Sequence, residues 1–150
     1  MKKIPIWILL LSFFFIKTLV AKEKKFLSLK NNKLNVRYGQ SFNFEIKYIY
    51  KKINLTLKQI DKKENWRRVI DLKNNSGWIH SSQLNEEANS IIILEDKILF
   101  QKSTNFSKPI ARLEKGRLLV IKNCKNDWCN IITDNYTGWI NTKNIWGSTK

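Results

Sequence analysis

An internal repeat constrains this chain more than any other feature of its 150 residues. A pattern of tryptophan, glycine and aliphatic residues occurs twice at nearly the same spacing, as Trp66-x2-Val69-x7-Gly77-Trp78-Ile79-x4-Leu84 and as Trp128-x2-Ile131-x6-Gly138-Trp139-Ile140-x4-Ile145. Upstream, Phe42 matches Phe106 and Ile46 matches Ile110, and both pairs are 64 residues apart in the numbering. Self-similarity at a fixed period is the signature of duplicated structural units. The sequence therefore predicts two copies of one small domain.

Short runs of β-branched and aromatic residues, separated by Asn, Gly and Ser, make up both copies, and long amphipathic helical patterns are absent. The runs cover residues 34–37, 43–50, 54–60, 66–70 and 77–79, and then 91–94, 98–101, 117–121, 128–132 and 138–140. Evenly spaced short strands of this kind indicate an all-β barrel or sandwich. Because side chains alternate along a strand, we expect Ile79 and Ile140 to face the core, with Trp78 and Trp139 on the opposite face or at the barrel end.

Turn residues suggest where each copy begins and ends. Residues 74–77 and 134–138 are predicted turns, and we expect their glycines, Gly77 and Gly138, to adopt positive φ. Residues 85–89 form the only short acidic stretch without β-branched residues, so the boundary is predicted there, between domains 26–84 and 90–147. A module of about 60 residues is marginal alone, so the copies should pack together or be stapled.

The N-terminal segment, residues 1–21, has the layout of a secretory signal peptide. A basic start, Met1–Lys3, precedes an apolar run from Ile4 to Ile16, and a small residue, Ala21, ends the segment. Export with cleavage after Ala21 is predicted. An uncleaved anchor is the alternative, although a span needs about 20 apolar residues. Either outcome predicts a periplasmic or extracellular protein.

The chain is strongly basic, with a formal charge of +16 that becomes +13 when the three lysines of the predicted signal are removed. Residues 22–84 carry 15 basic and 5 acidic side chains, against 10 and 5 in residues 90–150. Coding bias is one explanation, because lysine outnumbers arginine by 23 to 5. An anionic envelope partner is the other. Without a recognition helix or stacking motif, an exported chain is not expected to bind nucleic acid.

Both copies resemble bacterial SH3-like (SH3b) domains, whose usual pattern is an Asn-Val-Arg opening, a Trp-x-x-Val strand and a Gly-Trp-Ile ending. The first copy matches the opening motif at residues 34–41. Residues 46–52, 65–69 and 77–82 resemble a particular exported proteobacterial subgroup with tandem copies. The second copy lacks the opening but keeps residues 111–116, the Cys124-x4-Cys129 pair and residues 145–147. The resemblance covers residues 26–147 and implies two small β-barrels that bind peptide or cell-wall ligands, often beside an enzyme.

The two cysteines, Cys124 and Cys129, flank a predicted two-residue hairpin turn at Asn126 and Asp127. This turn places the cysteines directly opposite each other on paired strands. An even cysteine count in an exported chain favours a disulfide. Two reduced, partly buried thiols are the alternative.

No catalytic, metal or cofactor site is predicted. A cysteine peptidase needs a free cysteine beside a histidine, whereas both cysteines are better used on each other and His80 is the only histidine. A zinc site needs about four ligands, which this chain does not supply. We therefore expect a protein without enzymatic activity and without a cofactor.

Aromatic and basic residues of the first copy are the candidate ligand-binding site. Tyr38, Tyr48 and Tyr50 have polar counterparts in the second copy at the offset of 64, namely Lys102, Arg112 and Glu114. Residues kept by one copy only are not required by the shared fold. With Arg67 and Arg68 they could bind a carboxylate-bearing peptide; a solvated face with packing between the copies is the alternative.

These features together predict a non-enzymatic binding or adaptor module of the cell envelope, with a peptidoglycan stem peptide as its ligand. A protein–protein adaptor for an acidic periplasmic partner or enzyme is one alternative, and an unrecognised hydrolase is another of a different class. If the N-terminal segment stays attached, the basic residues 22–25 would lie at a lipid surface, and the module would be tethered to the membrane.

Overall fold

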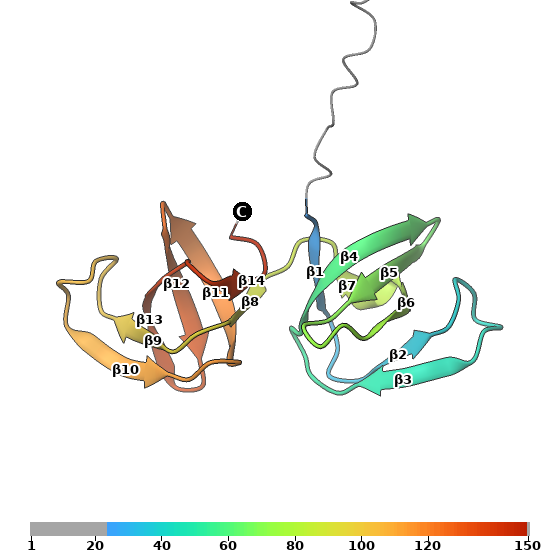
Figure 1. Ribbon diagram of the computed structural model, residues 1–150, viewed down its shortest axis with the longest axis horizontal. Helices are drawn as coiled ribbons and strands as arrows, with labels where there is room; N and C mark the ends of the chain where they lie inside the picture. Colours follow the sequence, from blue (N-terminus) through green and yellow to red (C-terminus); the bar gives the residue numbers. More distant parts are fainter. Residues whose placement is uncertain (1–23, 150) are drawn as a thin grey trace, which may run out of the picture.

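The computed structural model describes residues 24–149 and shows two β modules side by side (Figure 1). The predicted signal peptide, residues 1–21, lies outside the described residues. The first module contains β1 (Phe26–Leu29), β2 (Leu34–Arg37), β3 (Ile46–Tyr50), β4 (Thr56–Lys63), β5 (Trp66–Ile70), β6 (Ser76–His80), the 3-10 helix η2 (Ser81–Gln83) and β7 (Leu84–Asn85). The second contains β8 (Ser90–Ile93), β9 (Lys97–Phe100), β10 (Pro109–Leu113), β11 (Leu118–Lys125), β12 (Trp128–Thr133), β13 (Tyr136–Asn141) and β14 (Ile145–Trp146). Within residues 24–149 no helix is long and apolar enough to cross a membrane.

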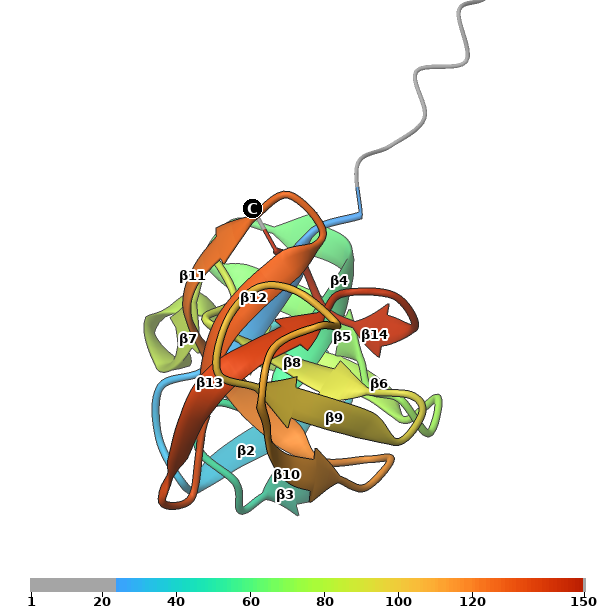
Figure 2. The same cartoon turned by 90° about the vertical axis from the view of Figure 1, so that its left-hand side faces the viewer.

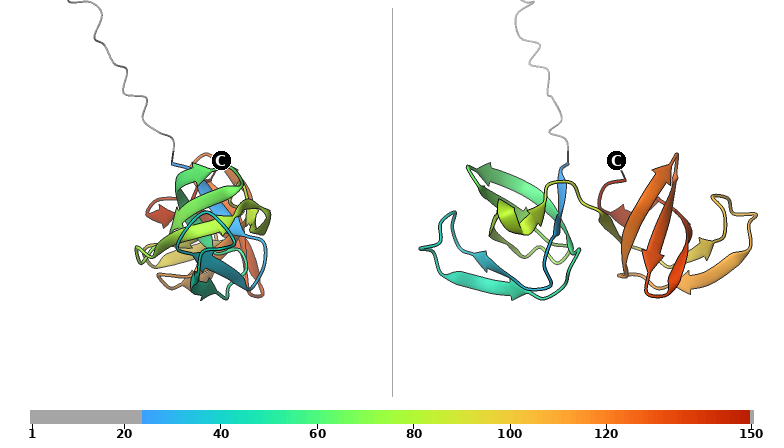
Figure 3. Two further views of the ribbon diagram at one scale, coloured as in Figure 1. Left: turned by 90° about the vertical axis from the view of Figure 1, so that its right-hand side faces the viewer. Right: turned by 180° about the vertical axis from the view of Figure 1, so that it is seen from behind.

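Each module is a seven-stranded antiparallel sheet that curls on itself, as the further ribbon views show (Figures 2 and 3). The strand order is β3-β2-β6-β5-β4-β1-β7 in the first sheet and β10-β9-β13-β12-β11-β8-β14 in the second. Adding seven to every label of the first order gives the second, so the repeat in the sequence is a repeat of topology. This confirms the predicted all-β architecture of two tandem small domains.

The two cores consist of aliphatic side chains and one cysteine, Cys129, that point inward from the strands. Leu27, Leu29, Leu34, Val36, Leu57, Val69, Ile79 and Leu84 fill the first core, and Ile91, Ile93, Leu99, Leu113, Leu119, Cys129, Ile131 and Ile140 fill the second. Ile79 and Ile140 are fully buried, as the alternation predicts, whereas Trp78 and Trp139 lie on the outward side and are half-buried. The inward positions therefore account for the aliphatic residues of the repeat, Val69 and Ile79 in the first copy and Ile131 and Ile140 in the second.

The expectation of positive φ at Gly77 and Gly138 is wrong. Both glycines lie within strands, and the positive φ angles of the preceding turns belong to Asn74 (64°) and Asp134 (46°). A Cβ added to Gly77 would meet Val36 Cγ1 at 2.3 Å, and one added to Gly138 would meet the Phe100 carbonyl oxygen at 2.7 Å. The repeat needs glycine here because a neighbouring strand approaches the backbone closely.

The offset of 64 is one too large for the segment that contains the three tyrosines. Arg37 pairs with Ile46 on β3, and its topological equivalent Phe100 pairs with Pro109 on β10, which sets the offset at 63. The structural counterparts of Tyr38, Tyr48 and Tyr50 are therefore Gln101, Ala111 and Leu113. A slip of one residue exchanges the two faces of a strand. The expected polar counterparts of Tyr48 and Tyr50 are therefore wrong, whereas Tyr38 still has a polar counterpart, Gln101 in place of Lys102.

The modules meet through buried hydroxyl groups and one tryptophan. Thr56 Oγ1 on β4 lies 2.8 Å from Ser90 Oγ on β8, and both residues are fully buried. Trp146 on β14 donates its indole N–H to the Thr56 carbonyl oxygen at 3.0 Å and packs edge-on against Phe26, with 5.3 Å between ring centroids. These contacts tie the last strand of the second module to the first module.

Candidate functional site

Three side chains form a row across the outer face of the first module. Strand β6 lies between β2 and β5, and Trp78 is the register partner of Arg37 on one side and of Arg68 on the other. Directly opposed side chains on paired strands have Cβ atoms about 4.5–5.5 Å apart. The indole of Trp78 therefore lies between two arginines. We refer to Arg37, Trp78 and Arg68 as the cationic row.

The cationic row opens into a cleft of about 230 Å³ whose lining contains no acidic side chain. The lining residues are Arg37, Tyr38, Lys47, Arg68, Ser76, Gly77 and Trp78. The row continues on β4 to Asp61, the register partner of Arg68, but among the described residues these two side chains form no ion pair. The cleft combines three cations with two aromatic rings and so has the chemistry of an anion site.

Two of these cations are held in place by the protein. The Arg37 guanidinium donates to the Phe44 carbonyl oxygen at 2.6 Å and lies 5.6 Å from the ring centroid of Phe42. Lys47 Nζ donates to the Ser76 carbonyl oxygen at 2.8 Å and lies 5.5 Å from the ring centroid of Tyr38. Carbonyl and ring contacts orient a cation without neutralising its charge.

Arg68 differs from the other two cations because its side chain is exposed and uncommitted. Within residues 24–149 its guanidinium makes no ion pair or hydrogen bond. Arginine presents a planar fork of donors that fits a carboxylate in a bidentate arrangement. Arg68 is thus the group in the cleft best placed to bind an incoming anion.

Tyr38 and Arg68 are the two predicted site residues that line this cleft. The ring of Tyr38 is 61% exposed on the loop after β2. Arg37, Lys47 and Trp78 were not among the site residues predicted from the sequence. Alternation along β2, β5 and β6 is the signal that could have grouped Arg37, Arg68 and Trp78 on one face.

Tyr48 and Tyr50 lie elsewhere, with their rings packed against the core of the first module. The rings meet edge-on with centroids 5.2 Å apart, and the Tyr50 hydroxyl donates to Asp71 Oδ2 at 3.0 Å. Burial raises the pKa of both phenols above the ordinary value. Partial burial also raises the pKa of Asp71, but hydrogen bonds from Asn75, Tyr50 and Lys73 outweigh it and leave that pKa low.

Arg67 is buried on the opposite side of β5 from Arg68, with 7% of the residue exposed. Its guanidinium forms an ion pair with Glu86 at 2.9 Å and donates to the Glu64 carbonyl oxygen at 2.9 Å. Glu86 also pairs with Lys25 at 2.5 Å. The structure does not bring Arg67 into the cleft; it closes one end of the first module.

The second module carries different side chains at the same three places. Trp139 on β13 is the register partner of Phe100 on β9 and of Asn130 on β12. Phe100 therefore takes the place of Arg37, and Asn130 that of Arg68. We refer to Phe100, Trp139 and Asn130 as the neutral row. Only the tryptophan is common to both rows, so the two arginines of the row are specific to the first module.

The predicted disulfide between Cys124 and Cys129 is confirmed. The cysteines are register partners across the β11–β12 hairpin, and Asn126 at its turn has a φ of 53°. His80 lies in the first module, where its Nδ1 is 2.8 Å from Ser82 Oγ and caps helix η2. Within residues 24–149 no group of three or more His, Cys, Asp or Glu side chains is placed to hold a metal ion.

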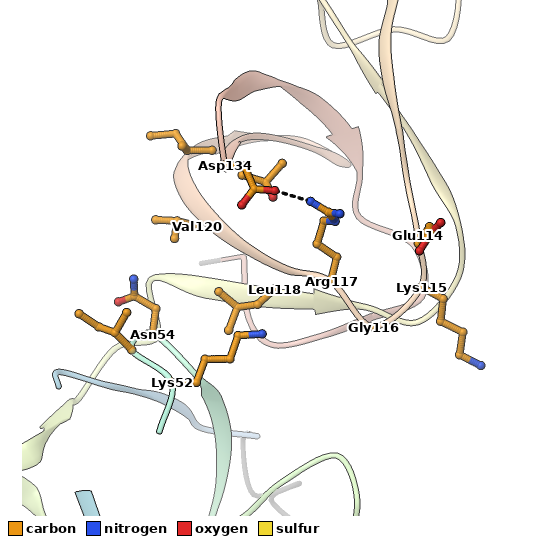
Figure 4. A pocket seen from close by; sticks show the side chains of 12 residues that line it. Lys52, Asn54, Glu114, Lys115, Gly116, Arg117, Leu118, Val120 and Asp134 are labelled. Atoms are coloured by element: carbon orange, nitrogen blue, oxygen red, sulfur yellow. Dashed lines mark hydrogen bonds and ion pairs between the residues drawn. The ribbon is translucent and has the colours of Figure 1, made fainter. Parts of the chain in front are cut away.

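A larger cleft of about 690 Å³ lies between the modules (Figure 4). Its lining combines Lys52 and Ile53 of the first module with Arg117 and Asp134 of the second. Arg117 Nη1 and Asp134 Oδ2 face each other at 2.6 Å, so this arginine is already neutralised. Because its charges are mixed and partly paired, this cleft is a weaker candidate for an anion than the cationic row.

The fold defines a class of protein built from two small β-barrels in tandem, each with an outward row of side chains centred on a tryptophan. A family model for the bacterial SH3 domain matches residues 30–86 and 98–147, more than half of the chain. The chain therefore belongs to the bacterial SH3 domain family and contains two copies of the domain. A comparison with curated proteins gives no match.

Two solved structures are similar to this chain, NlpC2 and NlpC1 from Trichomonas vaginalis. NlpC2 is 11% identical with a TM-score of 0.39, and the alignment covers 83% of this chain and 48% of that one. NlpC1 is 12% identical with a TM-score of 0.38, and the alignment covers 83% of this chain and 46% of that one. This chain thus spans about half the length of each of these proteins.

Proposed function

We propose that this protein is a non-enzymatic binding module of the cell envelope that recognises carboxylate-bearing peptide of the kind found in peptidoglycan. The observation that carries the proposal is the cleft at the cationic row, where Arg37, Lys47 and Arg68 surround Trp78 without an acidic neighbour in the lining. Membership of the bacterial SH3 domain family supports a binding role. Export, as the N-terminal sequence predicts, would bring the module to such a ligand.

The recognition follows from the chemistry of the cleft. A ligand carboxylate accepts two parallel hydrogen bonds from the Arg68 fork, while Arg37 and Lys47 supply a positive field. The faces of Trp78 and Tyr38 provide a rigid apolar floor for the peptide backbone and small side chains. Charge attracts the ligand, and the fixed rings favour an extended peptide over a free ion.

Retention by insoluble peptidoglycan tests the proposal, measured at low and moderate salt beside a basic control protein of equal charge. The wild type should be retained above the control at both salt levels. Arg68→Ala should weaken retention about tenfold, because hydrogen bonds to a charged group are lost. Arg68→Lys should weaken it nearly as much, since lysine keeps the charge without the fork.

The matched control is Lys122→Ala, which removes one exposed positive charge from the second module. It should leave retention unchanged. If Arg68→Ala and Lys122→Ala lose the same amount, or if moderate salt removes all retention, the binding is generic and the carboxylate site is wrong. The protein–protein adaptor then becomes the better proposal, because residues 22–84 carry 15 basic against 5 acidic side chains, enough to hold an acidic partner.

A further inference from the structure

We propose that the second module carries a separate binding site for an uncharged, hydroxyl-rich ligand, namely a glycan, at the neutral row. The proposal rests on the proposed function in one respect, since it assumes that the outward row is where these modules meet ligands. The side chains of the row itself, Phe100, Trp139 and Asn130, determine which class of ligand it would bind.

The neutral row is not dictated by the fold. The same three positions hold Arg37, Trp78 and Arg68 in the first module and are compatible with the same strand order. Side chains on the outward face can change without disturbing either core. Replacing two cations with a phenyl ring and an amide therefore alters what the face can bind, not how it folds.

The aromatic groups of this face form a connected platform. Phe100 is the register partner of Trp139, and its ring lies 5.9 Å from that of Trp128, edge to face. The side chains of Phe100, Trp128 and Trp139 are half-buried. Part of each ring is therefore held by packing, and part remains accessible to a ligand. The adjoining β9–β10 loop lies at one far end of the molecule in Figure 1, and its Phe106 is 100% exposed and free to add to the platform.

Side-chain amides surround the platform and are able to hydrogen-bond a neutral ligand. The Asn130 side-chain oxygen lies below the surface without a hydrogen-bond partner among the described residues, so the amide NH2 is the group of Asn130 that could donate to a ligand. Asn105 and Asn141 line a cleft of about 270 Å³ together with Phe100. Each amide NH2 can donate to a ligand hydroxyl, and Asn105 also has an oxygen that is uncommitted within residues 24–149, whereas the Asn141 oxygen already accepts from the Lys143 N–H at 2.9 Å.

The charged groups near this cleft are largely cancelled by one another. Glu95 pairs with Lys97 at 3.0 Å, and Asp96 pairs with Arg112 at 2.8 Å. The Glu95 carboxylate also accepts a hydrogen bond from the Asn144 amide at 2.8 Å. These pairs leave no uncommitted anion among the described residues that line the cleft. Lys143 also lines it and is, within residues 24–149, the one lining cation without an ion pair there, but the face lacks the arginine fork that selects a carboxylate in the first module. A sugar ring, with apolar C–H faces and polar edges, fits a surface of aromatic rings and amides.

The test is a titration of the purified protein with chitotetraose, a soluble uncharged oligosaccharide, followed by the indole N–H signals in nitrogen–proton correlation spectra. The Trp139 signal, assigned with Trp139→Phe, should shift and saturate, and raising the salt should change the affinity little because the ligand is neutral. Asn130→Ala should weaken binding by about tenfold, since it removes the hydrogen-bonding amide.

Two variants separate a binding role from a structural one. Asn130→Ala should leave the melting temperature unchanged. The Asn130 side-chain oxygen has no hydrogen-bond partner among the described residues, so removing it breaks no hydrogen bond within the protein. The double variant Phe100→Arg and Asn130→Arg rebuilds a cationic row in the second module. It should lose chitotetraose binding and gain retention on peptidoglycan peptide carboxylates.

Failure of this proposal is distinguishable from failure of the proposed function. Arg68→Ala should leave the chitotetraose titration unchanged, and Asn130→Ala should leave the Arg68-dependent retention unchanged. Absence of a saturable Trp139 shift, or an equal affinity in Asn130→Ala, overturns the glycan site. A Trp139 shift with anionic lipid vesicles but not with the oligosaccharide also overturns it and assigns the face to a membrane surface.

Discussion

Two adjacent arginines of β5 have different roles because successive side chains of a strand point to opposite faces. Arg68 points outward into the cleft at the cationic row, and Arg67 points inward to Glu86. The place of Arg67 is taken in the second module by Cys129, which is bonded to Cys124. One copy therefore closes this end with an ion pair, and the other closes it with a covalent bond.

Glu86→Gln tests the ion pair at neutral pH. The change leaves the buried Arg67 guanidinium without its carboxylate, and we expect a loss of about 1–2 kcal/mol of unfolding free energy. This expected loss is smaller than the loss for a fully buried ion pair, because the Glu86 side chain is 43% exposed and solvent screens its charge. Glu87→Gln, at the exposed neighbouring residue, should change the urea midpoint little and serves as the control. Equal midpoints for the two variants would contradict the role assigned to Glu86.

The same carboxylate predicts how stability depends on pH. Partial burial raises the pKa of Glu86, but hydrogen bonds from Lys25 and Arg67 outweigh it and place that pKa below its ordinary value of 4.5. Because the folded pKa is depressed, the stabilisation is complete above the unfolded value and is lost as the pH falls through the folded value. Urea midpoints should therefore fall on acidification below about pH 4.5 in the wild type. Glu86→Gln should show a smaller fall over the same range.

At the scale of a strand, the close approach of β2 to β6 depends on Gly77. A Cβ at this position would meet Val36 Cγ1 at 2.3 Å, and Val36 is fully buried. Gly77→Ala should therefore cost about 1–3 kcal/mol, as overpacking a filled core does. Thermal unfolding measures the loss, and Ser76→Ala on the same strand is the control. A Gly77→Ala variant as stable as the wild type would show that the two strands can separate without cost.

The β11–β12 hairpin depends on its disulfide. By loop entropy a ring of about six residues is worth about 2 kcal/mol, so reducing agent should lower the melting temperature of the wild type. The variant Cys124→Ala with Cys129→Ala should melt low and should not respond to reductant. If the wild type were insensitive as well, the bond would contribute nothing to the stability of the hairpin.

The alternating strands could be predicted from the sequence, and the strands made by long-range pairing could not. Strands β2 and β5 have the predicted bounds because they carry their own pattern. Strands β7 and β14 have two residues each and exist only because β1 and β8 pair with them. A segment of two residues has no period, so no local signal marks it.

The candidate site was only partly predictable for a related reason. Tyr38 and Arg68 line the cleft, but Arg37 and Trp78 join them through pairing between strands that are distant in the sequence. The loop before β3 also shows the effect of an offset that is wrong by one residue. Phe42 packs on Trp66 with centroids 5.0 Å apart, whereas Phe106, its apparent match at the offset of 64, is completely exposed. The structural counterpart of Phe42 at the offset of 63 is Asn105.

At the scale of the whole molecule, Trp146 couples the two modules. Trp146→Ala removes both the hydrogen bond to the Thr56 carbonyl oxygen and the contact with the Phe26 ring. We expect the modules of this variant to tumble more independently, with shorter rotational correlation times in NMR relaxation. Trp146→Phe keeps an aromatic ring and should show a smaller change. Unchanged correlation times in Trp146→Ala would mean that the Thr56–Ser90 contacts alone hold the modules.

The buried hydroxyl contacts between β4 and β8 have a consequence for polymeric ligands. Because they fix the two modules relative to each other, the outward rows are held at one spacing, without the entropy that a loose linker would lose on binding. If both proposed sites bind, occupation of one row would give the other row a high effective concentration of any second group within reach on the same strand. A polymer that presents peptide and sugar at that spacing should then gain avidity, whereas a short fragment with only one of them should dissociate more quickly.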